Sequence, residues 1–196
     1  MVSYLVSTQP QLRHSGIESE PLISAISFYN ATTSNRIGFR GSEAAAFLEA
    51  RNIAIPTQPN QAVPISQCLW LLRLSQTEFW ILDTKSQHTE FIIELEKAAL
   101  AHAHVTRLYC QHSTAVFVLT GADCPNMFAK VCAVDLRAKA FPAGRIAQTS
   151  VARVSSVVVN VSKSDLEQTR FLILSDISSA DYLWRALDDA AMEFRE

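Results

Sequence analysis

The pattern of apolar and polar positions along the chain occurs twice. In each copy an apolar strand leads into a single glycine and then into an amphipathic helix. The first copy, residues 36–48, turns at Gly41, and the second, residues 115–128, turns at Gly121. A glycine between a strand and a helix supplies a backbone angle that a Cβ would penalise. The copies lie almost half a chain apart, which predicts one internal duplication.

The residues that follow the two glycines are typical of helix N-termini. Ser42 and Asp123 have side chains that cap a first turn, and Pro125 is tolerated in a helix only near its start. Within residues 43–51 the apolar positions recur at the spacing of one helix face. We therefore predict two short helices, each with a side-chain cap.

The same two periodicities predict the remaining elements. Runs of β-formers indicate strands, and apolar stripes at helical spacing indicate helices. The predicted strands are residues 22–29, 36–40, 62–66, 68–74, 79–82, 105–110, 115–120, 145–154, 156–161 and 171–174, and the predicted helices are 43–51, 86–102, 123–133 and one that begins at 178–181. Each half then has the order β-β-α-β-β-β-α, an α+β fold with two intimate, pseudo-symmetric halves. Pro64 places its strand at a sheet edge.

The chain is predicted to form one duplicated domain preceded by an arm. Residues 1–21 have mixed polarity and no clear period, which favours an extended N-terminal arm. Residues 22–196 form the domain, with halves of about 22–104 and 105–196. The 196 residues are enough to bury a sizeable core.

Composition excludes several classes of function. Charged residues make up only 18% of the chain, against about 25% in typical domains. This shortage fits a partner interface with a charge-depleted centre, a homodimer, or equally an ordinary compact domain. A net charge of −2 without a basic run argues against nucleic-acid binding, and no apolar run is long enough for a membrane span. The N-terminus lacks the basic region of a signal peptide, so we expect a cytoplasmic protein with four reduced cysteines.

The motifs of familiar cofactor and catalytic sites are absent. None of the five glycines belongs to a G-x-G-x-x-G or G-x-x-x-x-G-K-[ST] loop, so neither of these phosphate-binding turns is present. The chain also lacks the G-x-S-x-G and H-E-x-x-H motifs. We expect no FAD, NAD or ATP bound by these means, and no catalytic residue is assigned.

One cluster has zinc-ligand side chains but no recognised spacing. It comprises His102, His104, Cys110 and His112. His102 continues the apolar face of its predicted helix, and histidine near a helix C-terminus is favourable with the dipole. We therefore expect no metal site here.

Two further sets of side chains have both structural and functional interpretations. Asp135 and Arg137 are predicted to form a buried pair that fixes the following loop or meets a partner's charge. Trp70, Trp80 and Trp184 have the composition of an aromatic box for a planar ligand. Their positions on predicted strands and an apolar helix face favour core packing for at least two of them.

Several segments resemble the gamma subunit of heterotetrameric sarcosine oxidase. They are Arg36-Ile-Gly-Phe-Arg-Gly, Ile55-Pro56 with Pro59-Asn60, Glu78-Phe-Trp-Ile-Leu, Asp135-Leu…Phe141-Pro-Ala-Gly…Ala147-Gln-Thr149 and Asp181-Tyr-Leu-Trp-Arg. The resemblance covers roughly residues 35–195, and residues 135–149 are its most specific part. The candidate motif and interface residues are Asp135, Leu136, Phe141, Pro142, Gly144, Gln148 and Thr149, together with Gly41 and Gly121.

The resemblance implies a fold and a place in a complex. The fold is the folate-binding fold of the glycine-cleavage aminomethyltransferases, a duplicated unit whose first strands are exchanged between halves. The complex oxidatively demethylates sarcosine and passes the one-carbon unit to tetrahydrofolate. FAD, FMN, NAD and tetrahydrofolate belong to the larger subunits, so this chain would bind none of them. It would be a non-catalytic subunit that stabilises the large alpha subunit carrying the folate site.

The alternative is a stand-alone folate-binding or aminomethyltransferase-like protein, either monomeric or a homodimer. A pterin ring requires an aromatic wall and a buried carboxylate. Trp70, Trp80 and Asp83, which lie on or near neighbouring predicted strands, are the candidates for these roles.

Overall fold

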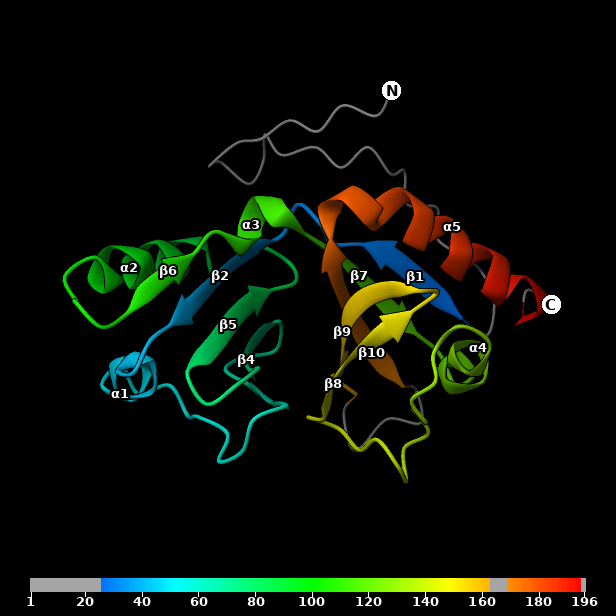
Figure 1. Ribbon diagram of the computed structural model, residues 1–196, viewed down its shortest axis with the longest axis horizontal. Helices are drawn as coiled ribbons and strands as arrows, with labels where there is room; N and C mark the ends of the chain where they lie inside the picture. Colours follow the sequence, from blue (N-terminus) through cyan, green and yellow to red (C-terminus); the bar gives the residue numbers. More distant parts are fainter. Residues whose placement is uncertain (1–25, 163–168, 195–196) are drawn as a thin grey trace. The chain divides into compact units, whose positions relative to one another are not determined.

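The computed structural model describes residues 26–162 and 169–194, which divide into two compact units (Figure 1). The middle unit comprises residues 33–113, and the terminal unit comprises residues 26–32 together with the described residues from 114 onward. The predicted arm, residues 1–21, lies outside the described residues. Each unit contains a five-stranded antiparallel sheet, which confirms the α+β class. Among the described residues, no helix combines the length and apolarity that crossing a membrane requires.

The middle unit has the strand order β3-β4-β5-β2-β6. Its elements are β2 (Asn35–Arg40), α1 (Ala44–Glu49), β3 (Gln61–Pro64), β4 (Leu69–Arg73), β5 (Glu78–Asp83), α2 (Thr89–Ala99), β6 (Thr106–Leu108) and α3 (Cys110–Ser113). Phe47 and Leu48 of α1 and Leu95 of α2 pack with alternate residues of the strands in one apolar cluster. β3, which contains Pro64, lies at the sheet edge as predicted.

The terminal unit has the strand order β1-β7-β10-β9-β8. Its elements are β1 (Ser27–Asn30), β7 (Thr114–Thr120), α4 (Cys124–Val131), β8 (Ile146–Val151), β9 (Val154–Asn160), β10 (Arg170–Asp176), η2 (Ile177–Ser179), α5 (Ala180–Ala191) and η3 (Met192–Phe194). The predicted hairpin over residues 145–161 is confirmed by the pairing of β8 with β9. Leu183 and Leu187 of α5 are fully buried in the apolar cluster of this unit.

The two sheets correspond strand by strand. Read from one edge, the orders are β6-β2-β5-β4-β3 and β1-β7-β10-β9-β8. β1 directly precedes β2 along the chain but pairs with β7, whereas β6 precedes β7 but pairs with β2. The edge strand of each sheet therefore comes from the chain segment that leads into the other sheet.

The two strand-to-helix turns require glycine, as predicted. Gly41 and Gly121 have φ angles of +152° and +146°, which L side chains rarely adopt. A Cβ added to Gly41 would lie 1.9 Å from the carbonyl oxygen of His104. This oxygen belongs to the backbone, so an alanine at position 41 would displace the chain segment that leads into β6.

The predicted side-chain caps are wrong, although Pro125 does lie in the first turn of α4. Glu43, not Ser42, is the N-cap of α1, and its side chain makes no capping hydrogen bond. Asp123 is the N-cap of α4, but its carboxylate accepts a hydrogen bond from the Asn126 side chain instead. The glycine carbonyls replace the side-chain caps, because those of Gly41 and Gly121 accept the first N–H of each helix.

Two other predicted elements are shorter than expected. Helix α2 spans only Thr89–Ala99. It begins later than predicted because Asp83 accepts the backbone N–H of His88 and holds the preceding residues in a loop. The strand predicted over residues 105–110 ends at Leu108, and Cys110 begins the short helix α3. The cause is the side chain of Arg36, described below.

Candidate functional site

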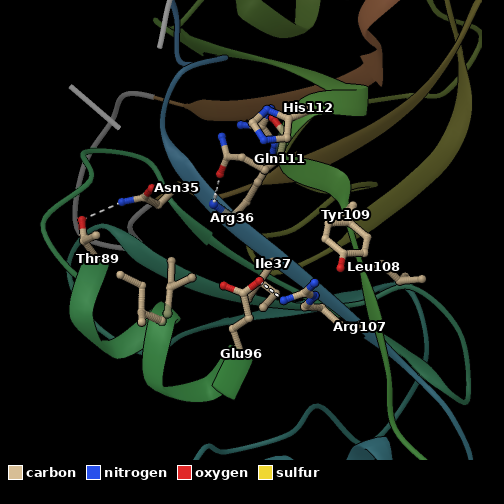
Figure 2. A pocket seen from close by; sticks show the side chains of 12 residues that line it. Asn35, Arg36, Ile37, Thr89, Glu96, Arg107, Leu108, Tyr109, Gln111 and His112 are labelled. Carbon is tan, nitrogen blue, oxygen red and sulfur yellow. Dashed lines mark hydrogen bonds and ion pairs between the residues drawn. The ribbon is translucent and has the colours of Figure 1, made fainter. Parts of the chain in front are cut away.

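A pocket of about 250 Å³ lies in the middle unit, between α2, β2, β6 and α3 (Figure 2). One side of its lining is apolar, with Ile37 of β2 and Ile93 of α2. The rest of the lining supplies hydrogen-bonding and charged groups from Asn35, Arg36, Thr89, Glu96, Arg107, Tyr109, Gln111 and His112. This mixed lining is typical of small-molecule or peptide contact sites.

The side chain of Arg36 joins β2 to α3 at one wall of the pocket. Its guanidinium is buried and donates from Nε to the Cys110 carbonyl at 3.1 Å and from Nη2 to the Gln111 carbonyl at 2.8 Å. Nη1 donates to the Ser34 carbonyl at 3.0 Å. Gln111 returns the contact, because its side-chain oxygen accepts the Arg36 backbone N–H (Figure 2). Arg36 therefore shapes α3 and has a structural rather than a catalytic environment.

The remaining charges of the pocket pair with one another. Glu96 of α2 forms an ion pair with Arg107 of β6 (Figure 2). The Arg107 guanidinium also lies 4.1 Å from the ring centroid of Tyr109, a cation–π contact. Tyr109 is 68% exposed and Ile93 is 40% exposed, so both present apolar surface at the rim.

Several polar groups of this pocket are engaged in hydrogen bonds and ion pairs. The Asn35 side-chain amide donates a hydrogen bond to the Thr89 hydroxyl at 2.7 Å. Burial raises the pKa of the neighbouring Cys110 thiol to about 12, so this thiol stays protonated and is a poor nucleophile. Glu96 is held by Arg107. The described lining therefore offers a rim of aromatic and aliphatic surface without an activated nucleophile.

The predicted Asp135–Arg137 pair exists, but the prediction that it is buried is wrong. Arg137 donates to the Asp135 carboxylate from Nε at 2.9 Å and from Nη2 at 2.6 Å. The Asp135 side chain is 42% exposed and the Arg137 side chain is 75% exposed. These hydrogen bonds from Arg137 lower the pKa of Asp135 to about 2. The pair orders an exposed turn, since the Arg137 N–H also bonds to the same carboxylate.

The structure divides the other motif residues between core and surface. Leu136 and Phe141 are buried in the apolar cluster of the terminal unit. The Phe141 carbonyl accepts a hydrogen bond from the Asn160 side chain at 2.7 Å, and Gly144 adopts a φ of +81°. The other motif residues of segment 135–149 lie at the surface of the terminal unit. Pro142 and Gln148 are exposed, and Thr149 is half-buried on β8. Gly121 is in the same unit, whereas Gly41 is in the middle unit.

The histidine and cysteine cluster is not gathered into a group of metal ligands in the part of the chain that the structure describes. The His102 ring packs edge-on against Phe47, at 5.0 Å between centroids. His104 and His112 are exposed, whereas Cys110 is buried. All four cysteines of the chain carry free thiols, as predicted.

The tryptophans do not form an aromatic box with Asp83. Trp184 packs between Phe28 and Phe117, with ring centroids 4.7 and 5.1 Å away. Trp70 and Trp80 are half-buried and lie outside the described apolar clusters, so core packing holds for only one of the three. Side chains alternate along a strand, which places Trp80 on the opposite sheet face from Asp83.

A group of three side chains was not among the sequence candidates. Cys68, Asp83 and His88 come together at one end of the β4–β5 hairpin. The pairing of Leu69 with Asp83 produces this proximity. The spacing of the three residues matches no recognised motif, so only the register of the hairpin could have indicated the group.

Comparisons with known proteins place the fold. No family model matches the chain, and no curated protein matches it. Among solved structures, it is similar to a chain of the heterotetrameric sarcosine oxidase from Corynebacterium sp. U-96, with a TM-score of 0.72 and 19% identity over 87% of this chain and 86% of that chain. It is also similar to the glycine cleavage system aminomethyltransferase T from Bartonella henselae, with a TM-score of 0.62 and 16% identity over 86% of this chain and 47% of that chain. The chain thus spans about half of that enzyme, and it has an aminomethyltransferase-like fold.

Proposed function

We propose that this chain is a non-catalytic, gamma-type subunit of a sarcosine-oxidase-like flavoenzyme complex. The observation that carries this proposal is the end-to-end likeness to a chain of a heterotetrameric sarcosine oxidase, which covers 87% of this chain and 86% of that one. Because the two shares are nearly equal, the matched chain has about the same length as this one. The likeness to the aminomethyltransferase covers only 47% of that enzyme. A small subunit fits this pattern better than a complete transferase.

The strand orders support the fold that this proposal requires. In our proposal the two sheets derive from one duplicated unit whose first strands, β1 and β6, were exchanged between the halves. The position-by-position match of the two sheet orders supports this history. So does the recurrence of a glycine with a positive φ at the same strand-to-helix turn, at Gly41 and Gly121.

The chemistry of the described residues supports a non-catalytic role. The charged groups of the pocket are engaged with one another or with backbone carbonyls. We propose that FAD, FMN, NAD and tetrahydrofolate are bound by the larger subunits, and that the substrate is sarcosine or a related N-methyl amine. The part of this chain would be to stabilise the alpha subunit that carries the folate site.

The exposed side of residues 135–149 is our candidate for the contact with that subunit. Packing in the terminal unit accounts for Leu136 and Phe141. It leaves Asp135, Pro142 and Gln148 at the surface. Interfaces combine a polar rim with apolar contacts, and the ordered Asp135–Arg137 pair would suit such a rim.

The alternative, a stand-alone folate-binding protein, has less support. Its candidate carboxylate, Asp83, is fully buried and accepts backbone N–H bonds from Lys85 and His88. The candidate aromatic wall at Trp80 faces the other side of the sheet. These residues therefore do not assemble one pterin pocket.

The test is a pull-down from native lysate with the tagged full chain. The proposal predicts a yellow eluate that contains large subunits and forms hydrogen peroxide when sarcosine or a related N-methyl amine is added. Flavin retained by the purified chain alone, or amine turnover by it, would contradict the proposal. A folded bait that recovers no flavin-containing subunit would contradict it as well.

Charge-reversal variants test the contact surface in the same experiment. Asp135→Arg should weaken recovery of the large subunit, because it places like charges beside each other in the exposed turn. Glu193→Arg is the matched control, since Glu193 is also an exposed acid in an ion pair of the terminal unit, with Lys130. Equal recovery with both variants would contradict the proposal that residues 135–149 contact the large subunit. It would not contradict the proposal that the chain is a subunit of the complex.

A further inference from the structure

Cys68, Asp83 and His88 form a compact group of potential metal ligands in the middle unit. One ligand atom from each residue lies within 4.8 Å of those of the other two. Cys68 directly precedes β4, Asp83 ends β5, and His88 directly precedes α2. The three residues thus link the ends of three elements. Thiolate, carboxylate and imidazole are the side chains that bind zinc in proteins.

The distances within the group suit a shared ion. His88 Nδ1 lies 3.7 Å from Cys68 Sγ and 3.7 Å from Asp83 Oδ1. The separation of 3.7 Å between nitrogen and oxygen is too long for a hydrogen bond. Ligand atoms bound at about 2.0–2.3 Å to one tetrahedral zinc ion lie about 3.3–3.7 Å from one another. The two distances from His88 Nδ1 therefore match those of a tetrahedral site, and all three ligand atoms lie within 4.8 Å of one another.

The second nitrogen of the histidine is engaged in the manner of a metal ligand. His88 Nε2 lies 3.1 Å from the Ser66 hydroxyl oxygen. A proton on Nε2 donates to this oxygen and leaves the Nδ1 lone pair directed at the thiol and the carboxylate. Histidine ligands of metals almost always have such a partner on the other ring nitrogen.

The carboxylate needs a positive partner. Asp83 is completely buried. Its oxygens accept the backbone N–H groups of His88 at 2.6 Å and of Lys85 at 3.3 Å. Among the ion pairs recorded for the described residues, its partner is only His88, which is charged only if protonated. Buried charges in proteins are paired or coordinate metals.

We propose that Cys68, Asp83 and His88 bind one Zn²⁺ ion. The mixed set of sulfur, nitrogen and oxygen ligands disfavours Mg²⁺ and Ca²⁺, because these ions prefer oxygen ligands alone. Three protein ligands leave a fourth position for water. The His88 side chain is 31% exposed, which gives the ion a path from solvent. The bound ion would join the start of β4, the end of β5 and the start of α2.

Binding of the ion releases the thiol proton to solvent. The Cys68 thiol donates to the Gln87 side-chain oxygen at 3.3 Å. Burial and the neighbouring Asp83 raise the pKa of this thiol, whereas Lys85 lowers it. A metal ion must displace this proton, because the thiolate is the form that binds zinc.

The test is a titration of the tag-free, reduced full chain with Co²⁺, followed by Zn²⁺. We expect one Co²⁺ per chain, a sulfur-to-cobalt charge-transfer band in the near ultraviolet, and loss of that band when Zn²⁺ is added. Cys68→Ser should abolish the band. Cys132→Ser is the matched control, because Cys132 is also a buried free thiol but lies outside the group, and it should keep the band.

Two further variants keep the proposal testable if Cys68→Ser fails to fold. His88→Gln changes a partly exposed side chain, and we expect at least a hundredfold loss of Co²⁺ affinity with an unchanged circular dichroism spectrum. Ser66→Ala removes only the partner of Nε2 and should lower affinity by roughly 10–100-fold. Absence of the band in the folded natural chain, or its persistence in folded Cys68→Ser or His88→Gln, would overturn the proposal.

Discussion

The middle and terminal units have corresponding strand orders but differ in the charged side chains that they bury. The terminal unit centres on a set of packed aromatic rings, which are Phe28, Phe117, Phe128, Phe141, Phe171 and Trp184. The middle unit contains both charged residues that are buried in the described chain, Arg36 and Asp83. The same sheet order therefore supports an apolar core in both units, and in the middle unit it also accommodates buried charged residues.

This difference indicates how each unit is stabilised. Apolar packing depends on volume and on the absence of cavities. Buried polar groups depend on having their hydrogen bonds completed, and loss of one partner leaves the others unsatisfied. Substitutions of similar size should therefore act through different mechanisms in the two units.

The largest effect is expected for Phe128→Ala in the terminal unit. Phe128 is fully buried, and its ring packs edge-on against Phe171 at 5.4 Å. The cavity should lower the free energy of unfolding by about 3–5 kcal/mol, measured by urea denaturation. Phe128→Leu keeps most of the volume and should lower it by much less. Equal losses for the two variants would show that packing volume is not what this core requires.

A somewhat smaller effect is expected for Arg36→Met in the middle unit. The substitution keeps most of the side-chain volume but removes the Arg36 donors from the carbonyls of Cys110 and Gln111. The Ser34 carbonyl loses one of its two donors and keeps the Gln111 side-chain amide. We expect a loss of about 3 kcal/mol in the free energy of unfolding. Arg40→Met on the same strand is the control, since the Arg40 side chain is 59% exposed and pairs with Glu78 at the surface. Similar losses for both variants would contradict a special role for Arg36.

A buried thiol in each unit, Cys110 or Cys124, should make the stability of both units fall in alkaline solution. Burial raises the pKa of Cys110 in the middle unit and of Cys124 in the terminal unit to about 12. The unfolded thiols ionise near pH 9, so the contribution of each thiol to stability should be constant below that pH and should be lost as the pH rises toward 12. Cys110→Ala and Cys124→Ala should each reduce the alkaline slope of stability against pH. An unchanged slope in either variant would contradict the burial of that thiol.

The smallest effect is expected for Asp135→Asn. Arg137 lowers the pKa of Asp135 to about 2, so the stabilising contribution of the carboxylate is present above about pH 4. It is lost as the pH falls toward 2. Because the pair is exposed and solvent screens it, we expect little change at pH 7 and a flatter acid limb in the variant. A large loss of stability at pH 7 would show that this turn supports the core.

The sequence pattern was sufficient where local rules determine the structure. The positive φ angles at Gly41 and Gly121, the edge position of Pro64 and the hairpin of β8 with β9 all follow from neighbouring residues. The side-chain caps failed because backbone carbonyls of the glycine turns took their place.

Other features depend on contacts between distant residues. The pairing of β1 with β7 and of β6 with β2 is not encoded in the periodicity of any one strand. Helix α3 forms because Arg36 binds carbonyls more than seventy residues away in the chain. The grouping of Cys68 with His88 depends on hairpin register and on the loop that Asp83 organises. Such sites cannot be found from residue spacing alone.

The most direct test of the proposed role is reconstitution of the complex. The large flavin-containing subunits would be expressed with and without this chain, and hydrogen peroxide formation from sarcosine or a related N-methyl amine would be measured in each preparation and in the chain alone. Our account predicts no turnover by the chain alone and a loss of soluble, active large subunit when the chain is omitted. Turnover by the chain alone, or full yield and activity of the large subunits without it, would contradict the account.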